Sequence, residues 1–142
     1  CYLSETNDLS FYQKNKIMKN QLALLLLLIS FTACSQTTTT SYKNIDQKIF
    51  ADMMTGKDVV ILDVRTPGEY SQGHIPSALL VDYTNPDFAA NVEALDKNKT
   101  YLVYCASGKR SSNASALMTK KGFKEIYNLE GGFNGWDGAK EK

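Results

Sequence analysis

The stretch that decides both the fold and the chemistry is Tyr101-Leu102-Val103-Tyr104-Cys105-Ala106-Ser107-Gly108-Lys109-Arg110-Ser111-Ser112. It begins with aromatic, aliphatic and β-branched residues that no turn residue interrupts, a pattern typical of a buried strand. Small residues follow, and residues 113–118 then have the composition of a helix. A cysteine is therefore predicted where a strand ends, and a short loop leads from it into the N-terminus of a helix.

That position favours the ionised form of the Cys105 thiol. The first amides of a helix lack intrahelical partners, and the helix dipole places partial positive charge there. A thiol facing those amides has a lowered pKa and becomes a nucleophile near neutral pH. The small loop residues also let backbone N–H groups turn inward as an anion-binding nest. The alternative is that Cys105 is only a small buried apolar residue.

Lys109 and Arg110 add positive charge to the same loop. The loop contains no carboxylate, so we expect both cations to favour the thiolate unopposed and to steer anions toward it.

Length, charge and cysteine spacing indicate a single domain and argue against a nucleic-acid-binding or metal-binding protein. The chain has 142 residues, enough for one domain, and a formal net charge of +1. Such a charge does not predict nucleic-acid binding. The three cysteines, Cys1, Cys34 and Cys105, lie far apart without metal-ligand or disulfide spacing. We therefore predict no metal site.

The N-terminal third of the chain has the pattern of a secretory signal. Positive charge between Lys16 and Lys19 precedes an unbroken apolar run over 22–29, and residues 30–33 lead into Cys34. The apolar run is short for a bilayer span, although an uncleaved membrane anchor is the alternative interpretation.

Phe31-Thr32-Ala33-Cys34 resembles the lipobox of bacterial lipoproteins, with Phe31 where that motif usually has Leu. The resemblance implies that Cys34 is lipidated and becomes the first mature residue, so that the protein is lipid-anchored in the cell envelope and faces the periplasm. The chain then divides into an upstream, non-native segment (1–17), a signal peptide that starts at Met18 (18–33), a polar tether (34–41) and the domain (42–142).

Strands and helices alternate through the domain. We expect strands at 42–45, 59–64, 78–81, 101–104 and 126–129, helices at 46–54, 66–70, 88–95 and 110–121, and a closing helical turn at 131–138. Ile49, Phe50 and Met53 should share one face of the first helix. This alternation predicts an α/β fold with a parallel sheet, in which sites lie beyond the carboxyl ends of the strands, where Cys105 is placed.

Four blocks of sequence together resemble a single-domain rhodanese: Asp63-Val64-Arg65-Thr66-Pro67-Gly68-Glu69-Tyr70, Gly73-His74-Ile75-Pro76-Ser77-Ala78, Cys105 to Ser111, and Leu129-Glu130-Gly131-Gly132-Phe133 with Trp136. The resemblance implies the three-layer rhodanese-like α/β fold with a central parallel five-stranded sheet. It also implies a sulfurtransferase in which Cys105 carries a sulfane sulfur as a persulfide. The substrate- and persulfide-binding loop would be Ala106, Ser107, Gly108, Lys109 and Arg110.

The expected chemistry is nucleophilic catalysis by Cys105. Thiosulfate or a polysulfide or persulfide donor would supply the sulfur, and a thiophilic acceptor would remove it, with no cofactor required. The partners implied are small sulfur-containing anions or thiols, a protein persulfide donor or acceptor, and the membrane through the lipid anchor. Ala106 stands where many rhodaneses have Arg, which favours polysulfide or a protein persulfide as donor.

The remaining motif residues are expected to be structural. We expect Asp63 and Arg65 to form a structural pair beside the loop. The resemblance places His74 in a structural turn, and we expect Trp136 in the core.

Two other functions share this architecture. A Cdc25-type phosphatase has five residues between cysteine and arginine, whereas Arg110 follows Cys105 after four and the sixth position is Ser111. A non-catalytic rhodanese-like binding module typically lacks the cysteine.

Overall fold

The computed structural model describes residues 41–142. The predicted upstream segment, the signal peptide, the lipidated Cys34 and the tether as far as residue 40 lie outside these residues. Among the residues described, no helix is both long enough and apolar enough to cross a membrane.

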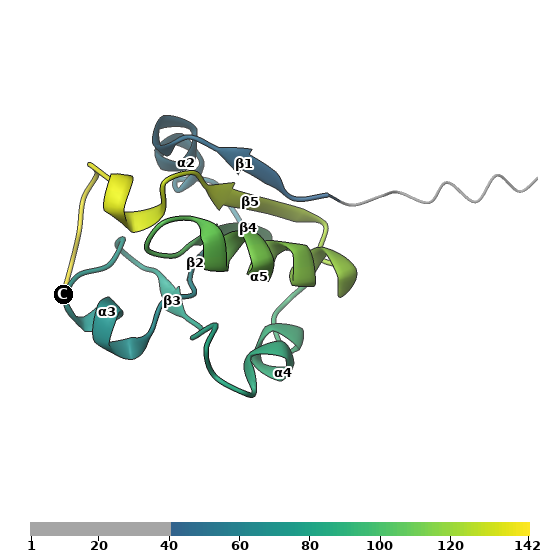
Figure 1. Cartoon of the computed structure of the whole chain (residues 1–142). Coiled ribbons are helices and arrows are strands. Elements are labelled where there is room, and N and C mark those ends of the chain that lie inside the picture. Colours follow the sequence, from purple (N-terminus) through teal and green to yellow (C-terminus); the bar gives the residue numbers. More distant parts are fainter. Residues whose placement is uncertain (1–40) are drawn as a thin grey trace, which may run out of the picture. The chain divides into compact units, whose positions relative to one another are not determined.

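A five-stranded sheet forms the centre of the domain (Figure 1). Its strands are β1 (Lys43–Ile45), β2 (Val59–Asp63), β3 (Leu79–Leu80), β4 (Thr100–Tyr104) and β5 (Glu125–Leu129). Their spatial order is β1-β5-β4-β2-β3, and every neighbouring pair is parallel. The predicted α/β fold with a central parallel five-stranded sheet is confirmed, and β4, which carries Cys105 at its end, is the central strand.

Helices cover both faces of this sheet and complete the three layers. They are α2 (Gln47–Met53), α3 (Pro67–Ser71), α4 (Phe88–Glu93), α5 (Lys109–Lys120) and the 3₁₀ turn η1 (Gly132–Gly135). Tyr101 and Val103 of β4 join the core formed with α4 and α5. Leu102 and Tyr104 join the core formed with α2 and Trp136, because successive strand residues point to opposite faces.

Local capping fixes where the first helices begin. Asp46 precedes α2, and its carboxylate accepts a hydrogen bond from the Ile49 amide at 2.9 Å. Phe50 is fully buried on this helix, whereas Ile49 is 46% exposed, so the prediction that both share the buried face is wrong for Ile49. Thr66 caps α3 in a reciprocal capping box with Glu69.

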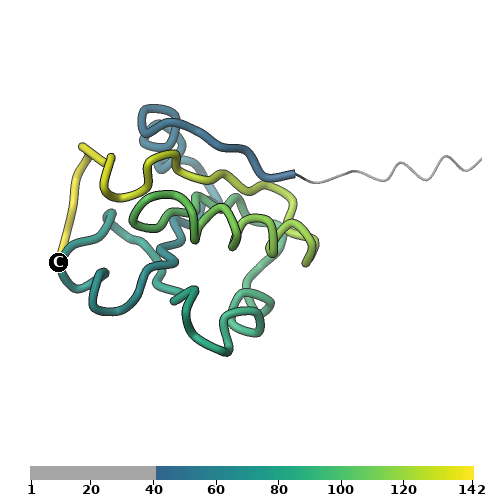
Figure 2. The backbone as a smooth tube through the Cα atoms, in the orientation of Figure 1, coloured from purple at the N-terminus to yellow at the C-terminus, as the bar shows by residue number. Residues whose placement is uncertain are grey.

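The carboxyl ends of the strands gather the candidate site. The loop from β4 into α5, the helix α3 and the turn η1 all lie at this end of the sheet (Figure 1), and the backbone can be followed from β4 through the loop in Figure 2. Segments separated by dozens of residues in sequence therefore meet around Cys105.

Candidate active site

Cys105 follows β4 directly, and the chain folds back over its sulfur. The residue is only 1% exposed. Gly108 has φ of 95°, a conformation that glycine adopts without a side-chain clash, and it forms the N-cap of α5. The Gly108 N–H donates to Cys105 Sγ at 3.1 Å, and the Ser111 hydroxyl donates to the same sulfur at 3.5 Å.

These donors stabilise the thiolate. Burial raises the pKa of the Cys105 thiol, but hydrogen bonds from the Ser111 hydroxyl and from the amides of Ser111, Ser107 and Gly108 outweigh it, so the pKa lies below its ordinary value. Ser107 and Gly108 belong to the predicted loop, whereas Ser111 was not predicted as a site residue. The signal for Ser111 was its place in the first turn of α5, within reach of a thiol that precedes the helix.

The two cations of the loop are arranged differently from the expectation. Lys109 is exposed. Arg110 donates from Nη1 to Glu69 Oε2 at 2.9 Å and from Nη2 to Glu69 Oε1 at 2.7 Å. The expectation that the cations favour the thiolate unopposed is therefore wrong for Arg110, because α3 supplies a carboxylate that the loop itself lacks.

Arg110 nevertheless lies beside the thiol. Its pKa is raised first by the hydrogen bond to Glu69 and further by the negative charge of Cys105. In turn, the hydrogen bonds from Arg110 and Thr66 outweigh burial and lower the pKa of Glu69 to about 2. The pair is consequently charged at every pH at which the protein is expected to work.

Asp63 and Arg65 form a buried ion pair at the end of β2. Arg65 Nη2 lies 2.7 Å from Asp63 Oδ2 and donates also to the Gly73 carbonyl at 2.8 Å, and the two residues are 4% and 0% exposed. The Arg65 guanidinium stacks on the Phe133 ring, 4.0 Å from its centroid. These contacts join three chain segments and agree with a structural role.

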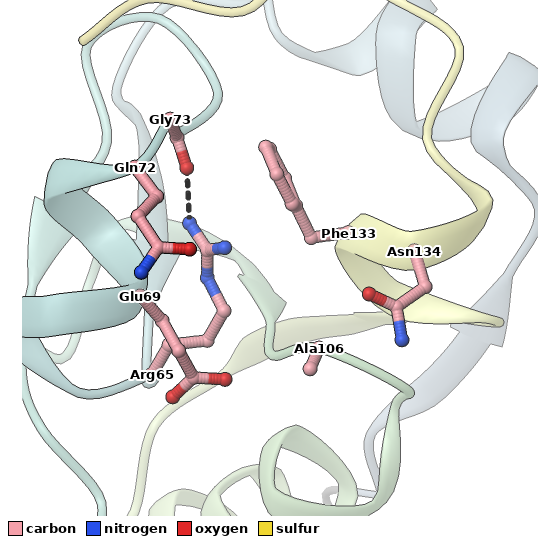
Figure 3. A pocket seen from close by; sticks show the side chains of 7 residues that line it. All are labelled: Arg65, Glu69, Gln72, Gly73, Ala106, Phe133 and Asn134. Carbon is pink, nitrogen blue, oxygen red and sulfur yellow. Dashed lines mark hydrogen bonds between the residues drawn. The ribbon is translucent and has the colours of Figure 1, made fainter.

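A pocket of about 290 Å³ opens beside the cysteine loop (Figure 3). Arg65, Glu69 and Gln72 lie on one side of it and Phe133 and Asn134 on the other, with Ala106 between them. Its full lining is Arg65, Glu69, Gln72, Gly73, Ala106, Phe133 and Asn134. Cys105 does not line this space, but the next residue does, so a substrate in the pocket would approach the sulfur past Ala106. Sequence reasoning did not predict Glu69, Gln72 or Asn134 as parts of the site.

The turn η1 holds the first residues of the loop in place. The Phe133 amide donates to the Cys105 carbonyl at 2.7 Å, and the Asn134 amide donates to the Ala106 carbonyl at 2.9 Å. Gly132 has φ of +58°, and a Cβ there would lie 2.5 Å from the Cys105 carbonyl oxygen. The Gly131-Gly132-Phe133 block thus supports the cysteine loop, a role that the sequence did not reveal.

His74 and Trp136 lie in structural positions. The His74 ring stacks on Tyr70 with 3.7 Å between centroids, and its Nε2 lies 3.4 Å from the Glu141 carboxylate. Trp136 is 3% exposed and packs edge-on against Phe50. Neither side chain lines the pocket. Within residues 41–142, no group of three His, Cys, Asp or Glu side chains gathers closely enough to hold a metal ion.

A buried thiol, held between the central parallel strand and a helix N-terminus and flanked by a pocket, defines an α/β domain built around a single cysteine loop. The sequence model of the Rhodanese-like domain family matches residues 46–139. The chain belongs to this family.

Known proteins similar to this chain agree with that assignment. The protein "Thiosulfate sulfurtransferase GlpE" of Coxiella burnetii is 36% identical over 95 residues, which cover 67% of this chain and 87% of that protein. The "tRNA uridine(34) hydroxylase" of Cytophaga hutchinsonii is 37% identical over 93 residues, but these are 63% of this chain and only 30% of that protein. The solved structure of a rhodanese-like domain protein from Staphylococcus aureus superposes with a TM-score of 0.59 at 32% identity, covering 66% of this chain and 90% of that one. The matched segment makes up most of the Coxiella and Staphylococcus proteins, and residues 41–142 lie within one compact unit of this chain.

Proposed function

We propose that the protein is a sulfurtransferase that moves a sulfane sulfur from thiosulfate, a polysulfide or a persulfide to a thiophilic acceptor through a persulfide on Cys105. The observation that carries this proposal is the Cys105 sulfur itself, which accepts hydrogen bonds from the Gly108 amide and the Ser111 hydroxyl beside an open pocket. Donors that stabilise a thiolate can also stabilise the anion of a persulfide. The relatives named as thiosulfate sulfurtransferases support the same class of reaction.

The first half-reaction loads the sulfur. The Cys105 thiolate attacks the outer sulfur of thiosulfate, a new S–S bond forms, and the S–S bond of the donor breaks. Sulfite leaves with the bonding electron pair. With an organic persulfide as donor, the leaving group is the thiolate of the donor.

The second half-reaction returns the enzyme to its starting state. Cyanide or a thiolate attacks the terminal sulfur of the persulfide, and the S–S bond to Cys105 breaks. The Cys105 thiolate keeps that electron pair, so no net oxidant or reductant is consumed. Two separate transfers through a covalent intermediate predict ping-pong kinetics.

Intact mass of the 41–142 fragment tests the proposal, because Cys105 is the only cysteine in it. Thiosulfate or polysulfide should add one sulfur, about 32 Da, by nucleophilic attack of the thiolate, and cyanide should remove it as thiocyanate. Cys105→Ser should abolish both steps. A fragment that gains no sulfur from either donor, or a serine variant that transfers sulfur as well as the parent, would contradict the proposal.

The same fragment separates the other two functions. A binding module would remain unmodified by sulfur donors. A phosphatase would hydrolyse aryl phosphates, which we do not expect, since Arg110 is engaged by Glu69 rather than turned toward an anion in the pocket.

We also propose that the protein is held in the cell envelope by a lipid on Cys34. The basic segment, the apolar run and the Phe31-Thr32-Ala33-Cys34 motif support this proposal.

A further inference from the structure

Charged side chains around the pocket occur as matched pairs. Among residues 41–142, Arg65 and Glu69 are the only charged residues that line it. Arg65 is paired with Asp63, and Glu69 is paired with Arg110 through two hydrogen bonds. The formal charges of these two acids and two bases cancel.

We propose that Glu69 is a specificity-determining residue, which makes the site favour neutral or monoanionic sulfur compounds over dianions such as thiosulfate. The inference rests on the proposed sulfur transfer and adds to it the charge class of the substrate.

The position of Glu69 allows this role. Its side chain is 34% exposed and lines the pocket (Figure 3). Its two carboxylate oxygens accept hydrogen bonds from the Arg110 guanidinium. The carboxylate therefore cancels the positive charge of Arg110, which would otherwise attract an anion into the pocket. Since Coulomb energy scales with the product of the charges, a dianion loses twice as much attraction through this cancellation as a monoanion does.

Apart from Arg65 and Glu69, the described residues that line the pocket carry no charge. Ala106 is apolar, and Gln72 and Asn134 contribute neutral amides. One face of the Phe133 ring is covered by Arg65, whose own charge Asp63 balances. Amides and an aromatic edge suit the organic part of a thiol persulfide better than they suit a compact dianion.

Two near-isosteric donors provide the experiment. Methanethiosulfonate has a methyl group where thiosulfate has a charged oxygen, so the two differ by one charge and transfer the same outer sulfur. In Glu69→Gln, which keeps the shape of the side chain and frees Arg110, kcat/KM for thiosulfate should rise while that for methanethiosulfonate changes less. The kcat/KM for methanethiosulfonate divided by the kcat/KM for thiosulfate should fall about five- to tenfold at low ionic strength and by less in high salt.

Alkylation gives a second readout that does not require sulfur transfer. Iodoacetate and iodoacetamide both alkylate Cys105, and only the first carries a charge. Glu69→Gln should raise the rate with iodoacetate relative to that with iodoacetamide. If neither donor forms a persulfide, the proposed function fails while the alkylation ratio still tests the role of Glu69.

Matched variants separate charge from structure. Glu130 is an exposed carboxylate just after β5 that does not line the pocket. Glu130→Gln should therefore leave unchanged both the kcat/KM ratio of the two sulfur donors and the rate ratio of the two alkylating reagents. Adding Arg110→Gln to Glu69→Gln restores neutrality and should return both ratios toward the parent values. Arg110→Gln alone leaves an unpaired Glu69 and should shift both ratios the opposite way, which keeps the test valid even if Glu69→Gln folds poorly. Ratios that stay at the parent value in folded Glu69→Gln and Arg110→Gln would overturn the proposal.

Discussion

Around Cys105, neutral donors hydrogen-bond the sulfur, and the Arg110 cation lies beside it. The Gly108 amide and the Ser111 hydroxyl lie within hydrogen-bond range, while Lys109 points to solvent and Arg110 is shared with Glu69. A neutral donor lowers the pKa of a thiol without attracting bulk anions into the site. Reactivity of the nucleophile and attraction of the substrate can therefore be set by different residues.

This arrangement predicts the pH dependence of the thiol. The folded pKa of Cys105 lies below its ordinary value, so alkylation by iodoacetamide should reach its plateau at a lower pH than for a free cysteine. In Ser111→Ala the sulfur loses a hydrogen bond, and the midpoint should move upward by about half to one pH unit. Ser112→Ala is the control, because the Ser112 hydroxyl bonds Tyr42 instead of the sulfur. Equal midpoints in the parent and Ser111→Ala would show that the hydroxyl does not stabilise the thiolate.

Between elements, the Glu69–Arg110 pair joins α3 to the N-terminus of α5. Glu69 has a pKa of about 2 in the fold against an ordinary value near 4.5. Because this pKa is lowered, the pair stabilises the fold above about pH 4.5, and the contribution is lost as the pH falls from there toward 2. Partial exposure of both side chains screens the interaction, so we expect about 1 to 2 kcal/mol.

Glu69→Gln should therefore be less stable than the parent at pH 7 by about that amount, with the gap closing between about pH 4.5 and pH 2. Urea unfolding of the 41–142 fragment at several pH values measures the difference directly. Glu93→Gln is the matched control, because Glu93 pairs with Lys121 and its side chain is more exposed than that of Glu69. Glu93→Gln should therefore lower the free energy of unfolding by less than Glu69→Gln does. A gap that is the same at pH 3 and pH 7 would mean that the charge of Glu69 is not the cause.

The backbone of η1 packs closely against the cysteine loop at Gly132. A Cβ on Gly132 would meet the Cys105 carbonyl oxygen at 2.5 Å, and the backbone there has a positive φ. Gly132→Ala should cost about 2 to 4 kcal/mol of unfolding free energy and should slow alkylation of Cys105, because the loop must shift. Gly68→Ala, whose Cβ would meet nothing within 4 Å, should be nearly neutral. Wild-type stability of Gly132→Ala would contradict the close packing.

At the scale of the whole molecule, the sequence was most informative where the signal is local. The apolar run at β4 and the alternation of strands and helices each depend on a few neighbouring residues, and the elements lie where these features predicted them. The prediction of five strands in one sheet came from the family resemblance. In a parallel sheet, the positions of the strands in the sequence do not show which strands are neighbours.

The parts of the site that were missed are long-range contacts. Arg110 and Glu69 are 41 residues apart. No pattern within the loop indicates that a carboxylate from α3 will neutralise the charge of Arg110. Likewise, the amides of Phe133 and Asn134 reach the Cys105 loop only because η1 follows the adjacent strand β5. Such pairings depend on the tertiary fold, so composition and spacing indicated the position of Cys105 at the strand end but not the charged groups around it.

A lipid on Cys34 would anchor the whole chain to a membrane. If Cys34 carries a lipid, each buried CH₂ group contributes about 0.8 kcal/mol to membrane binding, which salt does not screen. Protein expressed from Met18 in a Gram-negative host should therefore incorporate labelled palmitate, partition into the detergent phase and resist a high-salt wash. Cys34→Ala should abolish the labelling, while Cys105→Ala, which removes the thiol of the domain, should leave it intact. A mature protein that is released in soluble form without label would indicate ordinary signal cleavage, and retention of unlabelled protein in the membrane would indicate an uncleaved apolar anchor over residues 22–29.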